Sequence, residues 1–451
     1  MDNNAESVQT WQPPVYNIDR TPEPKCTLAP FGDTHNFARS AKWSPDGSVA
    51  LAQCENASFE YLDIPADLLS DVPLAARPQQ GIFRQPSPVL DFAWYPYATP
   101  LDAASFCFLA SVRECPVKLL DAADGRLRAS YKIVDHRERQ IAPHSLAFNT
   151  SATKIYCGFE DAIEVFDVNC PGEGSRWRTT PSKKSRDGLK GIISTLAFAP
   201  DASSGVFAAG TLSPPSPRSS NVAIFTEATG EVPVMYLSSD GVRASVTQVM
   251  FNPARPYMLY VAFRRRAYIY GWDLRGDVER PLQRFNRAFE SVSQDDLSIP
   301  GNGNEGKGDE TNQRLKFDVD AGGNWLSVGD QNGRISIFNL NATGTEEPAN
   351  AEDTSYVPSV NPTLTYHAHN DAVGSVSFHP YKPLLLSVSG SRHFDEAPSR
   401  DHLGTDSEES EESDLDNERE QQGPTLVTRS RLRPTPAVKD ASAKLWSFGA
   451  S

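Results

Sequence analysis

Clustered lysines and arginines are the residues of this sequence whose type and spacing best suit binding chemistry, because they can neutralise phosphate groups. The segment TTPSKKSRDGLKG carries four of them: Lys183, Lys184, Arg186 and Lys190. Two further groups are Arg137 and Arg139 in DHRER, and Arg264, Arg265 and Arg266 in a row. An aromatic neighbour such as Trp177 can stack on an unpaired base. The pattern favours contact with an RNA backbone, and the alternative is a set of isolated, solvated loops.

Catalytic chemistry finds less support in the residues. The sequence has no G-x-S-x-G, Walker-loop or H-E-x-x-H pattern. His367 and His369 are the best-spaced pair for a metal, but they precede a predicted strand, and a histidine that bonds within its own sheet is the alternative. The six cysteines form no C-x-x-C pair and are predicted to be small buried side chains. We therefore expect no enzyme, no metal and no cofactor.

Net charge gives a misleading view of the body of the protein. The chain carries −15, but residues 401–420 hold ten carboxylates and one arginine, which leaves −6 for the rest. This run lies within 392–436, a segment that cannot bury apolar area and is predicted to be disordered. Ser407, Ser410 and Ser413 lie in acidic surroundings that suit an acidophilic kinase, and a plain solvated loop is the alternative.

Short strands are the elements that must position these groups. Residues 144–167 contain three apolar runs, at 145–148, 154–158 and 162–166, separated by turn-forming residues. This spacing predicts an antiparallel meander. Because one sheet of three or four strands cannot bury both of its faces, it needs neighbours of the same kind.

The chain supplies seven such meanders. They recur at roughly 40 to 60 residues, as in propeller proteins, and they begin at Ala41, Asp91, Ser145, Ile193, Val246, Arg314 and Val373. Most end in an aromatic residue followed by a polar one, as in Trp272-Asp273, the degenerate end of a WD repeat. Closing the ring removes exposed sheet edges. We predict an all-β fold, a seven-bladed WD40-type β-propeller with disordered loop insertions.

The predicted propeller spans 37–448, and the acidic insertion interrupts its last blade. Residues 1–36 are predicted to be a partly extended N-terminal segment. Within it, 11–18 is expected to supply the outer strand of the last blade, since Pro13 and Pro14 fit only a sheet edge. No apolar run reaches the roughly 18 residues of a membrane span, and no secretory signal begins the sequence. We expect a soluble protein that is not secreted.

Several stretches, taken in order, resemble the telomerase Cajal body protein family of WD-repeat proteins, in a fungal-type form. They are AKWSPDGS from Ala41, RECPVKLLDAADGRLRASY from Arg113, PHSLAF from Pro143, YCGF from Tyr156, GIIS from Gly191, GWDLR from Gly271 and TNQRLKFDVD from Thr311. The resemblance covers about 37–448 and places Lys183 and Lys184 at the family's lysine pair before GIIS. Asn149-Thr150 departs from the family's Ser-Pro, and 1–36 is shorter than its tail.

The resemblance implies a non-catalytic WD-repeat scaffold that binds small nuclear or guide-type RNA and assists RNP assembly or nuclear localisation. In this family, animal members bind small Cajal body RNAs and telomerase RNA, and fungal relatives are linked to pre-mRNA splicing. The implied location is the nucleus, in Cajal body-like foci, and also the cytoplasm. The expected partners are a small nuclear RNA, guide or spliceosomal, and RNP proteins, with no membrane and no small-molecule substrate, and we expect a monomer. The alternative is a pure protein-protein interaction scaffold in a nuclear RNP or splicing complex without direct RNA contact.

Overall fold

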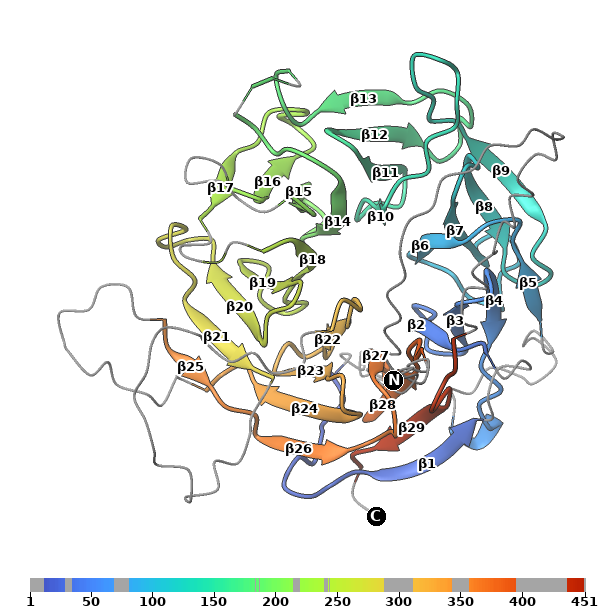
Figure 1. The fold of residues 1–451 in the computed structure, drawn as a ribbon, viewed down its shortest axis with the longest axis vertical. Helices are drawn as coiled ribbons and strands as arrows, with labels where there is room; N and C mark the ends of the chain where they lie inside the picture. The colour runs from blue at the N-terminus through green and yellow to red at the C-terminus, as the bar shows by residue number, and fades with distance from the viewer. Residues whose placement is uncertain are drawn as a thin grey trace, which may run out of the picture.

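The chain forms seven small antiparallel sheets arranged in a ring (Figure 1). The computed structural model describes residues 12–28, 35–68, 81–182, 184–185, 187–213, 220–238, 242, 244–287, 311–342, 357–394 and 436–449. Within these ranges the helical structure is the 3-10 turn η1 (Ala66–Leu68), and no described helix is long and apolar enough to cross a membrane. The predicted all-β, seven-bladed propeller is confirmed.

Each blade is a meander whose first strand lies nearest the ring centre and whose last lies at the periphery (Figure 1). Blade one contains β2 (Ala38–Trp43), β3 (Ala50–Cys54), β4 (Ser58–Tyr61) and β5 (Ile82–Arg84). Blade two contains β6 (Val89–Trp94), β7 (Cys107–Val112), β8 (Val117–Asp121) and β9 (Leu127–Tyr131). Blade three contains β10 (Ser145–Phe148), β11 (Lys154–Phe159), β12 (Ala162–Asp167) and β13 (Ser175–Arg178).

The remaining four blades repeat this arrangement. Blade four contains β14 (Ile193–Phe198), β15 (Val206–Thr211), β16 (Val222–Thr226) and β17 (Met235–Leu237). Blade five contains β18 (Val246–Phe251), β19 (Met258–Phe263), β20 (Tyr268–Asp273) and β21 (Gln283–Asn286), with β25 (Ser359–Val360) added in parallel at its edge. Blade six contains β22 (Phe317–Val319), β23 (Trp325–Gly329), β24 (Arg334–Asn339) and β26 (Leu364–His367). Blade seven contains β27 (Val373–Phe378), β28 (Leu384–Ser389), β29 (Ala443–Ser447) and β1 (Glu23–Leu28).

The strand that closes the ring is β1, which lies further along the chain than the expected 11–18. In β1 the register shifts between Pro24 and Cys26, so this proline occupies an irregular position on an edge strand, where no ladder hydrogen bond is lost. A proline does lie on the edge strand, as expected, but it is Pro24 and not Pro13 or Pro14. Tyr16 instead packs edge-on against Phe378 and Phe448, with ring centroids 5.1 Å and 5.9 Å away. The boundaries 37–448 stay a prediction.

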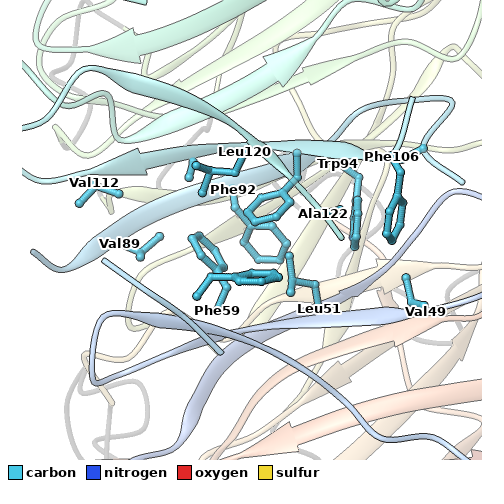
Figure 2. Close-up of a cluster of buried hydrophobic side chains, with 14 residues drawn as sticks. Val49, Leu51, Phe59, Val89, Phe92, Trp94, Phe106, Val112, Leu120 and Ala122 are labelled. Atoms are coloured by element: carbon cyan, nitrogen blue, oxygen red, sulfur yellow. The ribbon is translucent and has the colours of Figure 1, made fainter. Parts of the chain in front are cut away.

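The core lies between neighbouring blades, and Figure 2 shows the cluster that joins blades one and two. Phe59 from β4 packs edge-on against Phe92 and Phe108 from blade two, with ring centroids 5.5 Å and 5.0 Å apart. All three side chains are fully buried. Because each aromatic ring removes on the order of 150–250 Å² from water, these inter-blade contacts supply much of the ring's cohesion.

Hydrogen bonds between inner strands cross all seven blade junctions. Each joins a side chain of one inner strand to the backbone of the next: Lys42 to Phe92 (2.6 Å), Asp91 to Leu146 (2.9 Å), Ser145 to Ile193 (3.0 Å), Thr195 to Val249 (3.1 Å), Gln248 to Phe317 (2.8 Å), Asp318 to Phe378 (2.7 Å) and Ser375 to Ala41 (3.0 Å). The inner strands therefore have fixed relative positions around the central channel.

The ends of the acidic insertion meet where β28 ends and β29 begins in blade seven. His393 and Ala437 exchange backbone hydrogen bonds of 2.9 Å and 2.7 Å, so β28 and β29 pair as neighbours despite the insertion. Residues 395–435, with Ser407, Ser410 and Ser413, lie outside the described residues. The disorder and phosphorylation predicted there stay predictions.

Cysteine burial is less uniform than expected. Cys54, Cys107 and Cys157 are buried, as predicted, whereas Cys170 is exposed. Cys170 lies in the turn between β12 and β13, outside the strands that carry the three buried cysteines.

Candidate nucleic-acid interface

The predicted basic loops leave the ring on one face. Because strands alternate in direction within a blade, the connections into each inner strand and the turns between second and third strands lie at the same end. Inner strands run parallel to one another, as the bridge between Lys316 and Ser375 shows. We call the face where inner strands begin the upper face. Loops 132–144 and 179–192 and the turn 264–267 all belong to it.

The loop of Arg137 and Arg139 is shaped by its own carboxylate. Asp135 Oδ1 accepts hydrogen bonds from the backbone N–H groups of Arg137 (2.7 Å) and Arg139 (3.0 Å), and Asp135 Oδ2 lies 2.8 Å from the Arg139 guanidinium. The Arg139 backbone and side chain together lower the pKa of Asp135 to about 2. Both arginines are exposed. Arg139 is thus partly neutralised locally, and Arg137 presents the stronger positive field.

The loop between blades three and four has a fixed neck and an exposed tip. The Thr179 hydroxyl donates to the Leu189 carbonyl at 2.7 Å, and Leu189 is fully buried. Gly188 has a φ of +88°, and a Cβ there would lie 2.4 Å from the Thr179 carbonyl oxygen, so the neck requires glycine. Lys184 is exposed and Lys190 half-buried. Lys183 and Arg186 lie outside the described residues.

Trp177 occupies a different position from the one expected for a base-stacking ring. It packs edge-on against Tyr156, at 5.5 Å between centroids, and is stacked on Phe207 at 6.3 Å. Its indole therefore contributes to the junction of blades three and four. Sequence proximity to the lysines suggested a stacking role, but the ring belongs to outer strand β13, which packs across that junction.

The arginine turn of blade five is tied to the segment that leads into blade six. Arg264 and Arg265 are exposed, and Arg265 has a positive φ of 55°. The Arg265 Nε–H donates to the Asn312 side-chain oxygen at 2.7 Å. Arg287 donates to the carbonyl of Arg266. These contacts position the turn next to residues 312–316.

Further cations lie in this turn and at the starts of the inner strands, near the centre of the ring. We call Arg39, Arg264, Arg314 and Lys316 the channel-mouth cluster. The backbone N–H of Lys316 donates to the Gly374 carbonyl at 2.9 Å. A Cβ at Gly374 would lie 2.9 Å from the Arg39 carbonyl oxygen and 3.4 Å from the Gln313 amide. The chain around Arg314 and the chain around Arg39 thus both contact the start of blade seven, one on each side.

The charges of this cluster influence one another. Burial lowers the pKa of Arg314, and the charges of Arg264 and Arg39 lower it further, while Asp91 opposes them. Burial likewise lowers the pKa of Lys316 to about 8, with Lys42 and Arg314 adding to the effect against Asp91.

Sequence reasoning missed the channel-mouth cluster because its members come from blades one, five and six. Arg314 and Lys316 belong to the stretch TNQRLKFDVD, and nothing in that stretch indicates that Arg39 and Arg264 lie nearby in the fold. An available signal was repeat position. Lys316 aligns with Asp91 in the inner strand of blade two, whereas blades three and seven carry Ser145 and Ser375 there.

The histidines have structural roles. His369 is buried, and its ring nitrogens contact the hydroxyls of Ser387 (2.7 Å) and Ser442 (3.0 Å), so it bonds inside blade seven. Ser391 and Asp371 both lie 2.9 Å from the same nitrogen, Nε2 of His393. A catalytic triad needs its hydroxyl and carboxylate on opposite nitrogens. This cluster therefore does not have the geometry of a triad.

Comparison with known proteins gives one consistent similarity. No protein-family model matches the chain. Telomerase Cajal body protein 1 of Bos taurus is 28% identical over 370 residues, which cover 80% of this chain and 59% of that protein. The Drosophila melanogaster homolog of telomerase Cajal body protein 1 is 25% identical over 372 residues, 80% of this chain and 58% of that protein. A shorter match is guanine nucleotide-binding protein negative regulator 1 of Schizosaccharomyces pombe, 31% identical over 137 residues, 30% of this chain and 34% of that protein.

The chain spans about three fifths of the length of the curated relatives that match most of it. The matching proteins carry the family name to which the quoted stretches pointed, and the match extends over most of this chain. The resemblance to the telomerase Cajal body protein family is thereby confirmed over 80% of the sequence.

Proposed function

We propose that this protein is a non-catalytic WD-repeat scaffold whose upper face binds a small nuclear or guide-type RNA and assists assembly or nuclear localisation of its RNP. The observation that carries this proposal is that three basic segments, distant in sequence, lie on one face of the ring. Similarity to proteins named for telomerase and the Cajal body supports an RNP context. The RNA is of the telomerase, small Cajal body or spliceosomal class, and the protein resides in the nucleus, in Cajal body-like foci, and also in the cytoplasm.

The chemistry of the proposed contact is mainly electrostatic. Each lysine or arginine that neutralises a phosphate releases counterions, so affinity falls steeply as salt rises. Exposed side chains such as Lys184 and Arg137 can follow a flexible single strand without base specificity. A ring with fixed loop necks holds these charges in a constant arrangement. The protein acts as a monomer in this proposal.

A pure protein-protein scaffold is the second candidate, and one observation favours it. Val232, Val234 and Tyr236 are 61%, 51% and 40% exposed along the approach to outer strand β17. An apolar strip beside an outer strand suits an extended peptide that adds to the sheet edge. In that case RNP proteins are the direct partners and RNA association is indirect.

Two basic sets on opposite faces separate the candidates. The first variant replaces Lys183, Lys184 and Arg186 with alanine, and the matched control replaces Arg126, Arg275 and Arg280, which lie in turns of the lower face. We expect the first set to weaken RNA binding at least about tenfold at low salt and to reduce the salt slope. The control replacements should change neither the affinity for RNA nor its dependence on salt concentration.

The same variants, tested by ultraviolet crosslinking in the native organism, identify the RNA. Recovery of a defined set of small nuclear RNAs with the wild type, and their loss with the first set, would support the proposal. Equal recovery from both sets would contradict the basic-loop contact. No RNA above background, with protein partners retained, would favour the scaffold candidate.

A further inference from the structure

We infer that the channel-mouth cluster of Arg39, Arg264, Arg314 and Lys316 is a binding site for a phosphate group, carried by a small polyphosphate or by the end of a nucleic acid. The inference rests on the backbone contacts that bring the segments of Arg39, Gly374 and Lys316 together, and on the contact of Arg265 with Asn312. It does not depend on the contact of loops 132–144 and 179–192 with RNA proposed above. It assigns a ligand to a part of the upper face that loops 132–144 and 179–192 do not use, and it shares Arg264 with the arginine turn 264–267.

The ring itself holds two of these cations in position. Arg39 lies at a register shift in β2, between Ala38 and Ser40, where an extra residue leaves the ladder and its side chain is exposed. Lys316 is anchored through its backbone to Gly374 in blade seven. Gly374 in turn contacts the backbone of Arg39, so the two cations share one support.

The other two cations approach from blade five and from the segment before β22. Arg264 neighbours Arg265, whose guanidinium donates to Asn312 at 2.7 Å, and Arg314 follows two residues later. Arg314 and Lys316 are half-buried, whereas Arg264 is exposed. The cluster therefore combines two half-buried cations with exposed ones, and the exposed side chains leave it accessible to a terminal or small anionic group.

Among the described residues, the carboxylates near the cluster are few and already have partners. Asp91 accepts the Leu146 N–H at 2.9 Å and lies 4.0 Å from Lys42. Glu55 lies 3.1 Å from Arg39 and also pairs with Arg392. Among the described residues, neither Arg264 nor Arg314 forms an ion pair with a carboxylate. Positive charge is therefore in excess at the mouth, and a bound anion would relieve the repulsion.

Phosphate fits this charge arrangement better than a single carboxylate. A guanidinium presents two parallel N–H donors that match two phosphate oxygens, and a lysine ammonium adds a third direction. A phosphate monoester carries close to two negative charges at neutral pH, so it offsets more of the repulsion than a carboxylate does. Half-burial of Arg314 and Lys316 strengthens each contact, because the local dielectric is lower than that of water.

Isothermal titration calorimetry with inorganic pyrophosphate, on the full chain at low salt, tests the site. We expect the wild type to bind, Arg314→Gln to bind about tenfold more weakly, and Arg126→Gln, on the lower face, to match the wild type. Thermal unfolding shows whether each variant is folded. If Arg314→Gln does not fold, Arg264→Gln, at an exposed position of the same cluster, provides the same test.

Protonation supplies a second readout. The groups that face Lys316 are Asp91, Lys42 and Arg314, and its pKa of about 8 will rise when an anion binds. Binding near pH 8 should therefore take up protons, seen as a different heat in two buffers of unlike ionisation enthalpy. Affinity should fall as pH rises from 7 to 9, because free Lys316 loses its proton over that range.

The source of the phosphate is separated by competition. A 5′-phosphorylated oligonucleotide that displaces pyrophosphate better than its 5′-hydroxyl counterpart points to a nucleic-acid end, and equal competition by both points to a small polyphosphate. Absence of pyrophosphate binding, or equal affinity in the wild type and Arg314→Gln, would overturn the inference. The variant with alanine at Lys183, Lys184 and Arg186 separates the two proposals. If it loses its RNA crosslinks but still binds pyrophosphate, the phosphate site is independent of the RNA contact of the loop.

Discussion

The basic loops and the channel-mouth cluster are two cationic regions of one face, yet they are built in opposite ways. In loops 132–144 and 179–192 the charges lie close together in sequence, and Arg139 is paired with a neighbouring carboxylate, Asp135. At the mouth the charges come from segments that are distant in sequence, and the ring places Arg314 and Lys316 near one carboxylate, Asp91. Charges that are close in sequence are held together by a single loop. Charges from distant segments come together only when the complete ring has folded. The mouth should therefore be far more sensitive than the loops to damage in the core.

Truncation of a buried aromatic side chain between blades one and two should have the largest effect on stability. Phe108 is fully buried and contacts Phe59 at 5.0 Å and Trp94 at 5.7 Å. Phe108→Ala should lower the free energy of unfolding by about 3–5 kcal/mol, because it leaves a cavity between blades one and two. Urea denaturation measures this, with the exposed Leu127→Ala as control. A loss below about 1 kcal/mol would show that the junction is not a main source of cohesion.

A smaller loss of stability is expected from Gly374→Ala, which should weaken ligand binding at the channel-mouth cluster but not at the basic loops. Gly374→Ala places a Cβ 2.9 Å from the Arg39 carbonyl oxygen, and the backbone must shift to accommodate it. We expect a cost of about 1–3 kcal/mol and weaker pyrophosphate binding, with RNA binding by the loops retained. Gly276→Ala is the matched control, because the nearest atom to its Cβ would be 3.8 Å away. Unchanged pyrophosphate binding in Gly374→Ala would contradict the shared support of Arg39 and Lys316.

The smallest effect is expected at the loop of blades two and three. Asp135→Asn removes the partner of the Arg139 guanidinium at an exposed site. RNA affinity at low salt should rise by about twofold, because one nearby negative charge is gone, and the rise should vanish at high salt. Filter binding at two salt concentrations measures this. Reduced affinity would mean that the loop shape set by Asp135 matters more than its charge.

The fold could be predicted in considerable detail from the sequence, because its information is local and repeated. Alternating apolar runs with turns such as Ser44-Pro45-Asp46-Gly47 recur seven times, and each copy reinforces the interpretation of the others. The turn has a local cause: Asp46 accepts hydrogen bonds from the Ser44 hydroxyl (2.6 Å) and the Ser48 N–H (3.1 Å). The closing strand was misplaced because it pairs with residues more than 400 positions away, which no local pattern encodes.

The candidate site was predictable only in its loops. A run such as Arg264 to Arg266 is visible in the sequence. The hydrogen bond from this run to Asn312, however, depends on how blades five and six meet. Trp177 shows the converse, because a tryptophan near lysines suggested stacking on a base and the ring packs between blades instead. Arg39 and Arg314 could not be associated from sequence, since only the closed ring places both beside blade seven.

Crosslinking the full chain to its RNA and mapping the attached peptides by mass spectrometry tests the central claim most directly. We expect crosslinks on the upper face, in 132–144, 179–192 and 264–267. Crosslinks confined to the outer strands or to lower-face turns, such as those of Arg126 and Arg275, would contradict it, as would the absence of any direct crosslink.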